Sequence, residues 1–338
     1  MPKNNTPPRK PKGKKPQTKQ RPNKKDKTPK GNNETEITIL YANANMLKEK
    51  QSSLKSAAEA AQATVLTITE TGGKPPNIEG YKWIDTKERK KKGGGGVAIA
   101  VREDLLHRTS QPTNLEKADE ESAWIQINTT QNNKLFIGTY YGKQETTNED
   151  TIKEEYATLT TQINTLKTRG DVLLTGDFNA KIQIKREGTT IQAESRNGKH
   201  LKELVNQTET TIENTEKDAK GMWTRQNRGN ASEKSVIDYV LTAQTNKGRV
   251  TEIEIDEEGT YRLKANKDSD HNTIITKMET RAPKQERTFK RWKTTNKQGW
   301  KKFNEVFNQN QETLRDLSYE ECIKQIKDTM KNTIGEKQ

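Results

Sequence analysis

Two short apolar runs end on polar side chains that could bind a metal ion or a phosphate. Every second residue of a strand points to the same face, so in the run 37–43 the apolar residues of one face are followed by Asn43. The same alternation along 65–70 places the carboxylate of Glu70 beyond apolar residues. A carboxylate in such a place needs a partner, so both run ends are candidate site positions.

Two further runs carry carboxylates. The apolar run 172–175 is typical of a strand covered on both faces, and it is followed by Asp177 and Asn179, which point the same way. Within 236–241, Asp238 lies between apolar residues of one face. An unpaired charge is unfavourable there, so Asp238 requires a buried hydrogen-bond donor.

His271 is the candidate donor to Asp238. It is one of three histidines in the chain, and it directly precedes an apolar run at 273–278. An aspartate that fixes the tautomer of a histidine recurs in hydrolysis and phosphoryl chemistry. Together, Glu70 and Asp270 offer the hard oxygen ligands that Mg²⁺ or Mn²⁺ prefers, and no Cys/His cluster indicates zinc.

Each of these signals alone also has an ordinary structural explanation. A glutamate at a strand end is usually a solvated loop residue, Asp-Phe-Asn can form an Asx turn, and Ser-Asp before a strand can cap a turn. The combination, in this order along one chain, is what indicates a functional site.

The elements that must position these residues are short β-rich segments with helices between them. Period-2 alternation and apolar runs predict strands at 37–43, 65–69, 97–102, 123–128, 135–141, 172–175, 236–241 and 273–278. Helical spacing predicts helices at 47–62, 151–166 and 198–207. Helices interleaved with strands indicate a mixed α/β sandwich.

Charge and composition divide the 338 residues into three parts. Residues 1–33 contain twelve Lys or Arg and one acid, which leaves only +3 of the total +14 for the rest of the chain. Seven of the eleven prolines lie there too, so we expect a disordered basic tail at 1–34 that attracts polyanions or serves as an import signal. A domain at 35–282 follows, and then a basic linker and helical extension at 283–338.

Cysteine usage and hydropathy bear on the compartment. Cys322 is the only cysteine, which excludes a disulfide framework and a thiolate metal site within this sequence. The N-terminus lacks the apolar region of a secretion signal, and no window is apolar for long enough to cross a bilayer. We expect an intracellular, nuclear protein with no membrane partner.

The motif order resembles that of the endonuclease/exonuclease/phosphatase superfamily over residues 35–282. The series is Asn, Glu, Tyr, Gly-Asp-Phe-Asn, Ser-x-Ile-Asp-Tyr and Ser-Asp-His, and the glycine-led run at 93–99 is similar to the family's third strand. The resemblance implies a four-layer αββα sandwich. Asn45, where repair members usually have Asp, and the Ser235-Val-Ile-Asp238 run are more like the non-LTR retrotransposon branch.

The resemblance also implies roles for the candidate residues. Glu70 would be the metal ligand, with Asn43 and Asp270 at the ion or next to its ligands. Asp177 would orient or deprotonate the attacking water, and His271, oriented by Asp238, would stabilise charge on the phosphate. Two residues would contact the phosphate or the water: Asn179 and Tyr141. A one-residue register error would exchange Tyr141 for Tyr140.

Two segments are similar to parts of retrotransposon proteins that lie outside the catalytic motifs. One of them, residues 223–234, resembles a hairpin that recognises target DNA. We therefore expect DNA contacts from Thr224, Arg225 and Arg228. The alternative is that this segment is an exposed polar turn. The segments around Arg291 and 300–303 resemble the connector before a polymerase. No reverse transcriptase motif follows in this sequence.

The sequence therefore predicts a Mg²⁺-dependent DNA endonuclease, with Mn²⁺ as a possible substitute, that leaves 3′-hydroxyl and 5′-phosphate ends. In a retrotransposon the nick primes reverse transcription, with element RNA and a reverse transcriptase as partners. Rival hypotheses are an abasic-site repair endonuclease, a lipid phosphoesterase of the same superfamily, and a catalytically inactive nucleic-acid-binding module.

Overall fold

The computed structural model describes residues 36–280 and 296–334, except 89–94, 116–120, 130–132, 187, 216–217, 228, 231, 244–248, 266–267, 311, 313 and 315–316. The predicted tail at 1–34, the linker around Arg291, Arg228 and the start of the glycine-led run at 93–94 therefore lie outside the described residues. Contacts divide the chain into Met1–Thr35 and Glu36–Gln338.

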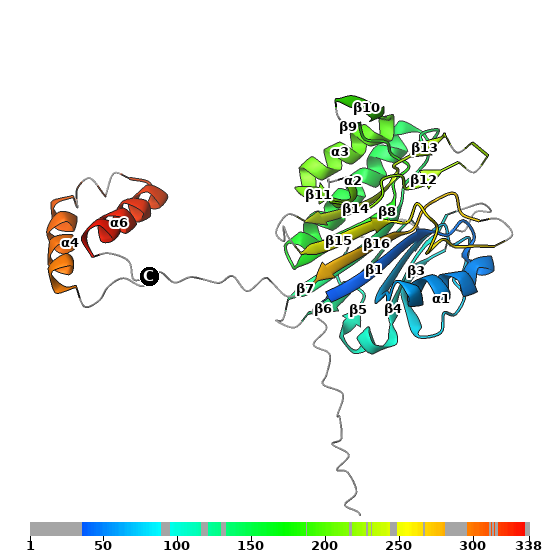
Figure 1. The fold of residues 1–338 in the computed structure, drawn as a ribbon, viewed down its shortest axis with the longest axis horizontal. Helices are drawn as coiled ribbons and strands as arrows, with labels where there is room; N and C mark the ends of the chain where they lie inside the picture. Colours follow the sequence, from blue (N-terminus) through cyan, green and yellow to red (C-terminus); the bar gives the residue numbers. More distant parts are fainter. Residues whose placement is uncertain are drawn as a thin grey trace, which may run out of the picture. The chain divides into compact units, whose positions relative to one another are not determined.

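Two six-stranded sheets form the centre of the fold (Figure 1). The first has the order β15 (Val250–Ile255), β16 (Ile274–Glu279), β1 (Glu36–Asn43), β2 (Val65–Thr69), β4 (Val97–Arg102) and β3 (Tyr81–Lys87). The second has the order β11 (Thr210–Ile212), β14 (Asp238–Ala243), β8 (Asp171–Asp177), β7 (Lys134–Tyr141), β6 (Ser122–Asn128) and β5 (Thr109–Ser110).

Each sheet contains one parallel pair, β1 with β2 and β7 with β8, and is otherwise antiparallel. Two small ribbons are added, β9 (Ile184–Arg186) with β10 (Thr189–Gln192), and β12 (Arg225–Gln226) with β13 (Lys234–Ser235).

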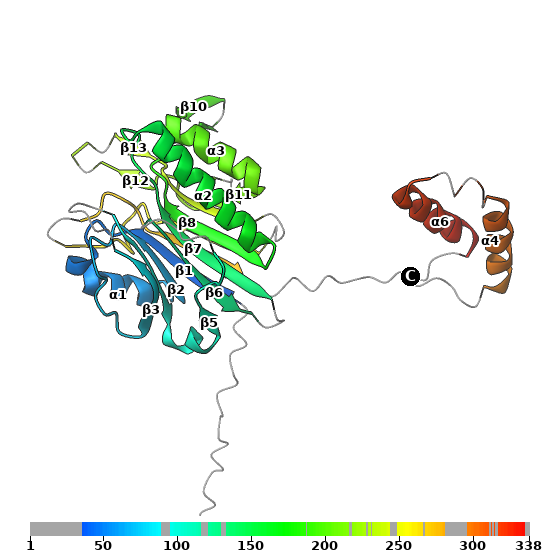
Figure 2. The ribbon, with the colours of Figure 1, turned by 180° about the vertical axis from the view of Figure 1, so that it is seen from behind.

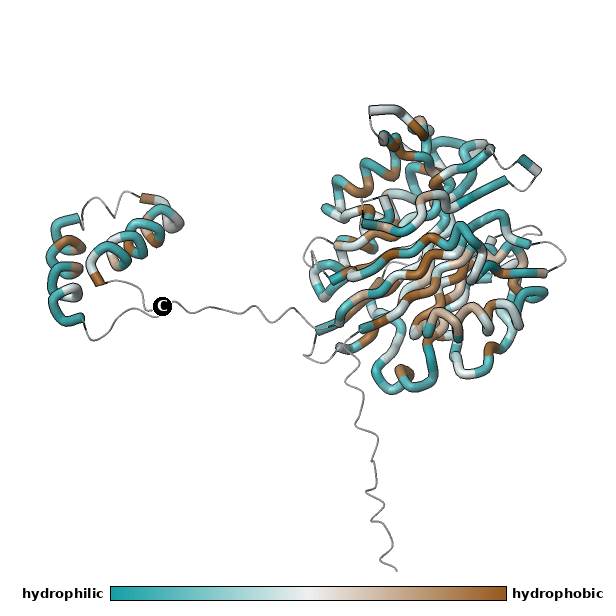
Figure 3. The backbone as a smooth tube through the Cα atoms, in the orientation of Figure 1, coloured by the Kyte–Doolittle hydropathy of each residue, from teal (hydrophilic) through white to brown (hydrophobic). Residues whose placement is uncertain are grey.

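Strand alternation sends side chains into separate cores on the two faces of each sheet. In β1, Ile37 and Ile39 enter the core between the sheets, whereas Leu40 packs on the outer face. In β8, Leu173 lies between the sheets and Leu174 lies outside. Figure 3 shows the resulting apolar strands at the centre of the domain.

Helices cover both outer faces, which completes the predicted four-layer αββα sandwich (Figure 2). The helix α1 (Gln51–Ala60) covers the first sheet, and α2 (Glu149–Lys167) and α3 (Arg196–Thr208) cover the second. Short 3₁₀ turns complete the domain: η1 (Leu47–Lys50), η2 (Glu103–Arg108) and η3 (Glu213–Thr215).

Most predicted elements are confirmed, with shifted ends. The strand predicted at 172–175 continues to Asp177, because this carboxylate-bearing residue is paired with both Tyr141 and Asp238. Within that strand Gly176 permits the close approach, since a Cβ there would lie 2.2 Å from the Tyr140 carbonyl oxygen. The strand predicted at 236–241 begins two residues later, at Asp238.

The single helix predicted at 47–62 is instead a 3₁₀ turn followed by α1. The break lies at Lys50, whose side chain is buried and donates to the carbonyl oxygens of Ala44 and Asn45 at 2.6 and 2.5 Å. Lys50 therefore holds the loop that follows β1, where Met46 adopts a left-handed backbone (φ 75°).

Two helices near the C-terminus pack against each other, α4 (Lys297–Gln309) and α6 (Tyr319–Thr333). Ser318 and Glu321 form a capping box at the start of α6, and Asn296 donates to the Ile334 carbonyl oxygen at 3.0 Å. The predicted helical extension is confirmed here. None of the described helices is long and apolar enough to cross a membrane.

Candidate active site

Polar residues from both sheets meet at one end of the sandwich. Asn43 ends β1 and Glu70 follows its parallel neighbour β2, while Tyr141 and Asp177 are paired at the ends of the parallel strands β7 and β8. An antiparallel strand begins at the end of the sheet where its neighbour finishes. The strand β14, which is antiparallel to β8, therefore begins at this end with Asp238, and His271 lies at the same end, just before β16.

Asp238 and His271 form a buried pair. The His271 Nδ1 lies 3.0 Å from Oδ1 and 2.9 Å from Oδ2 of Asp238, as the sequence predicted. Asp238 is fully buried, and its backbone carbonyl accepts from Asn214 at 3.0 Å. Because Nδ1 faces the carboxylate, the other ring nitrogen, Nε2, is left for the site and lies 3.8 Å from Oδ2 of Asp177.

Sequence reasoning missed a third member of this group, Tyr41. Its hydroxyl donates to Asp238 Oδ1 at 2.6 Å and lies 3.2 Å from the Thr69 hydroxyl. Tyr41 is fully buried between the sheets. The signal that could have found it was its position two residues before Asn43, on the same face of the same strand.

Asn43 links the two sheets. Its Nδ2 donates to Glu70 Oε1 at 2.9 Å and to Asp177 Oδ2 at 3.0 Å. Its Oδ1 accepts from the backbone of Asn45 at 3.1 Å, which fixes the orientation of the amide. Glu70 itself has a left-handed backbone (φ 51°), so its carboxylate leaves the strand sharply.

Asn179 lies on a tight turn directly after β8. Its backbone is left-handed (φ 46°), and its N–H donates to Asp177 Oδ1 at 2.9 Å, which is the Asx geometry that the sequence allowed. Its side-chain amide donates to the Gly142 carbonyl at 2.8 Å. The buried Asn197 donates to the Asn179 carbonyl at 3.1 Å and so supports the turn from α3.

The register of β7 decides between the two candidate tyrosines. Tyr141 points between the sheets towards Glu70 and Asp177, and burial together with these carboxylates raises the pKa of its hydroxyl. Tyr140 points to the outer face, where its ring packs 5.1 Å from the ring of Phe178 and its hydroxyl donates to Glu155. Tyr141 is therefore the tyrosine at the site.

The predicted DNA-recognition hairpin places its residues differently. Thr224 is fully buried, and its hydroxyl accepts from the backbone N–H groups of Ile237 and Asp238 at 3.0 and 3.1 Å. The Thr224 side chain has no exposed surface, and the DNA contact expected of it stays a prediction. Arg225 is partly exposed, and its Nε donates to Asp270 Oδ2 at 2.8 Å.

Burial and crowded charges shift the acid–base behaviour of the site. Burial and the nearby Asp238 raise the pKa of Asp177 to about 7, although His271 acts in the opposite direction. Burial lowers the pKa of His271, but Asp238, Asp177 and Asp270 outweigh this and raise it to about 10. A charged imidazole thus faces a carboxyl group that titrates near neutral pH.

The site has donors suited to a hard divalent cation. Among the described residues, Asp177, Asp238 and His271 have ligand atoms within 4.8 Å of one another. Both oxygens of Asp238 already contact the imidazole, so this trio does not itself make an oxygen-rich cation site. Glu70 shares the Asn43 amide with Asp177, and Asp270 adds a carboxylate 3.9 Å from Nε2 of His271. A cation would offset the negative charge that, together with burial, raises the pKa of Asp177.

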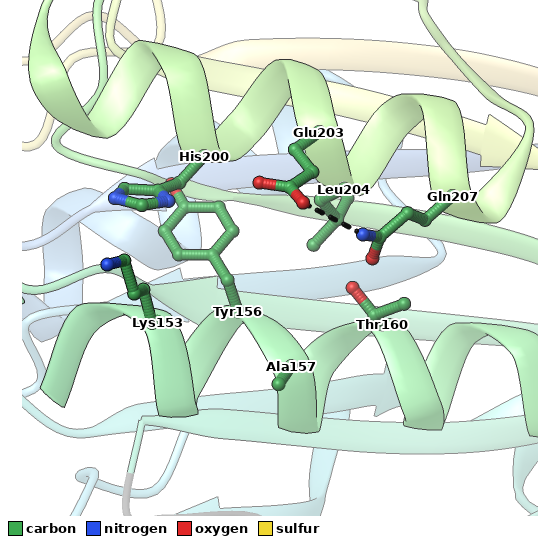
Figure 4. A pocket seen from close by; sticks show the side chains of 8 residues that line it. All are labelled: Lys153, Tyr156, Ala157, Thr160, His200, Glu203, Leu204 and Gln207. Atoms are coloured by element: carbon green, nitrogen blue, oxygen red, sulfur yellow. Dashed lines mark hydrogen bonds between the residues drawn. The ribbon is translucent and has the colours of Figure 1, made fainter. Parts of the chain in front are cut away.

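A cavity of about 300 Å³ lies elsewhere, between α2 and α3 (Figure 4). Its lining comes from these two helices only: Lys153, Tyr156, Ala157, Thr160, His200, Glu203, Leu204 and Gln207. Both helices pack on the outer face of the second sheet, so this cavity is not part of the site at the strand ends.

Comparison with known proteins agrees with this architecture. Residues 135–275 match the model of a family described as endonuclease-reverse transcriptase. The endonuclease domain of TRAS1, a telomere-specific non-LTR retrotransposon, is 18% identical, with a TM-score of 0.55 over 73% of this chain and 100% of that domain. No curated protein matches the chain.

Two further solved structures share the fold. The AP endonuclease LMAP from Leishmania major is 14% identical, with a TM-score of 0.59 over 74% of this chain and 89% of its own. The 3′-5′ exonuclease NExo from Neisseria meningitidis is 16% identical, with a TM-score of 0.55 over 72% of this chain and 100% of its own.

The fold of this chain is similar to that of the retrotransposon endonuclease domain and the AP endonuclease. Residues 135–275 are similar to the endonuclease-reverse transcriptase family.

Proposed function

We propose that this chain is a divalent-metal-dependent DNA endonuclease that nicks its target and leaves 3′-hydroxyl and 5′-phosphate ends. The observation that carries the proposal is the buried Asp238–His271 pair, which directs Nε2 of the imidazole to within 3.8 Å of Asp177. Phosphodiester hydrolysis needs a positioned water, a proton acceptor and charge neutralisation at the phosphate. Asp177 is suited to the second of these tasks, and His271 contributes to the third.

Asp177 is the proposed proton acceptor. Burial raises the pKa of this carboxyl group, which favours taking a proton from water, and Asn43 and the Asn179 N–H hold its two oxygens in place. His271 donates from Nε2 to a phosphate oxygen, because its Nδ1 is occupied by Asp238. Tyr141 and Asn179 complete the phosphate contacts.

Glu70 and Asp270, with Asn43, are the proposed holders of Mg²⁺. A bound divalent cation supplies charge neutralisation at the phosphate and at the departing 3′-oxygen. Mn²⁺ prefers the same oxygen donors. The protein's own contribution is to hold these donors at the ends of β1 and β2 and in the segment before β16.

The setting that we propose is target priming by a non-LTR retrotransposon, in which the nick supplies the 3′-hydroxyl for reverse transcription. This rests on the family match at 135–275 and on the likeness of the fold to the TRAS1 endonuclease domain. Element RNA and a reverse transcriptase would then be partners, and the nucleus would be the place of action.

Nicking of supercoiled plasmid tests the proposal directly. With Mg²⁺ we expect relaxed circles, which disappear with EDTA and with Glu70→Ala and His271→Ala, each falling at least 100-fold. His107→Ala and Glu59→Ala are matched controls, because both side chains are exposed and lie on η2 and α1, outside the candidate site. If all variants nick equally, a contaminating nuclease explains the activity.

An oligonucleotide with one abasic site separates this proposal from repair. The retrotransposon hypothesis predicts equal cleavage of intact and lesion-bearing duplexes. Strong preference for the lesion would favour the repair endonuclease instead. DNA binding without cleavage, in Mn²⁺ as well as Mg²⁺, would favour the inactive binding module.

A further inference from the structure

The two oxygens of Asp270 face two different cations. The Arg225 Nε donates to Oδ2 at 2.8 Å, and the His271 Nε2 lies 3.9 Å from Oδ1. The Arg225 guanidinium is therefore already bonded to one oxygen of this proposed metal ligand.

Backbone bonds hold Arg225 beside Asp270. Arg225 forms an antiparallel bridge with His271, and the N–H of the next residue, Gln226, donates to the Asp270 carbonyl at 2.9 Å. On the other side of Arg225, the Thr224 carbonyl accepts from Asn272 at 2.7 Å. The base of the β12–β13 hairpin is thus joined to the segment that carries both site residues.

A divalent cation and the guanidinium compete for the same carboxylate. We propose that Arg225 is the counter-ion of Asp270 in the free protein and moves to a DNA phosphate when DNA binds, so that DNA binding and metal binding strengthen each other. This inference rests on the proposed function. It makes Arg225 a positioning residue that controls when Asp270 is available.

The exposure of the pair makes this exchange possible. The side chains of Arg225 and Asp270 are 43% and 31% exposed, and ion pairs at such places contribute little net stability. A guanidinium also binds the oxygens of a phosphate in a two-pronged manner. The ion pair of Arg249 and Asp171 is different, because its side chains are only 5% and 14% exposed and cannot reach a ligand.

Mn²⁺ titration of the free protein by calorimetry tests the first half of the proposal without any turnover. Arg225→Gln is expected to bind Mn²⁺ about fivefold more tightly than the wild type, since it removes a competing charge worth up to about 1 kcal/mol. Arg225→Lys keeps the charge and should stay close to the wild type. Arg102→Gln is the matched control, because Arg102 donates to Asp104 at 2.8 Å at the other end of β4.

The second half is tested by repeating the titration with a phosphorothioate duplex that gel analysis shows to be intact afterwards. Linkage requires that the duplex tighten Mn²⁺ binding by the wild type, and the gain should be smaller for Arg225→Gln. Equal Mn²⁺ affinities of wild type and Arg225→Gln, together with nicking by the wild type, would overturn this inference and leave the proposed function standing. Absence of both Mn²⁺ binding and nicking would overturn both.

Discussion

At the residue scale, the site consists of polar groups whose partners are already fixed. The Asp238 carboxylate is hydrogen-bonded to Nδ1 of His271 and to the hydroxyl of Tyr41. The side-chain amide of Asn43 donates to both Glu70 and Asp177. Such preorganisation means that little rearrangement is needed when charge develops on a phosphate. Removing one donor should therefore be felt in both stability and rate.

Tyr41→Phe tests this at a residue that would not touch the substrate. The variant loses a 2.6 Å bond to a buried carboxylate, so we expect the free energy of unfolding to fall by about 1.5–3 kcal/mol, and the nicking rate to fall as His271 loses its fixed orientation. Urea denaturation and plasmid nicking measure the two effects.

Tyr81→Phe is the comparison for Tyr41→Phe, because Tyr81 is also buried but donates to the neutral carbonyl of Ala63 at 2.6 Å. It should lose only about 0.5–1.5 kcal/mol and keep full nicking activity. Equal losses of stability and activity in the two variants would contradict the role that we assign to Tyr41.

At the scale of elements, the two edge strands of the first sheet were not predicted from the sequence. β3 and β15 carry charged residues such as Lys82 and Glu252, which interrupt the apolar pattern by which strands were recognised. Charged side chains protect edges from pairing with other chains. On β15, Glu252 also accepts from Lys277 of β16 at 2.6 Å and from Lys220 at 2.8 Å.

The lowered pKa of Glu252 predicts that its contribution to the stability of the fold depends on pH. Hydrogen bonds from Lys220 and Lys277 lower its pKa from 4.5 to about 2, so the stabilisation is fully present above about pH 4.5 and is lost as the pH falls through about 2. Glu252→Gln should cost less than about 1 kcal/mol at pH 7, because the side chain is 33% exposed.

Chemical denaturation of this variant between pH 7 and pH 2 provides the measurement. The difference from the wild type should shrink below pH 4.5, as Glu252 takes up its proton and the ion pairs are lost. A difference that stays constant down to pH 2 would rule out the ion pairs as its cause.

At the scale of the whole molecule, the positive charge is concentrated outside the domain that carries the candidate site. Residues 1–33 hold +11 of the total +14, and this segment lies outside the described residues. A basic segment binds polyanions by releasing counterions and reads no sequence. We therefore expect the tail to supply affinity for DNA and the domain to supply the chemistry.

Deletion of residues 1–33 should weaken DNA binding and reduce its salt dependence by about 0.9 logarithmic units for each phosphate that the tail neutralises. Nicking at low salt should be unaffected. Fluorescence anisotropy between about 50 and 200 mM salt gives the slope, and a variant with the Lys and Arg of the tail changed to Gln separates charge from length. An unchanged slope in both proteins would show that the tail does not bind DNA.

The αββα class, most strand positions and the polar residues at the strand ends could all be predicted from the amino-acid sequence. These features depend on local patterns, since apolar alternation of period two reveals a half-buried strand wherever it occurs. Asn43, Glu70 and Asp177 could be singled out in this way because each lies at the end of such a run.

Which polar groups meet could be learned only from the folded chain. Tyr41 bonds to Asp238 across 197 residues, Tyr141 rather than Tyr140 faces the site, and Thr224 is buried as a backbone support. A strand pattern does not say which of its two faces meets the other sheet, and it does not identify a distant partner. Those choices follow from how the two sheets pack, which local sequence does not contain.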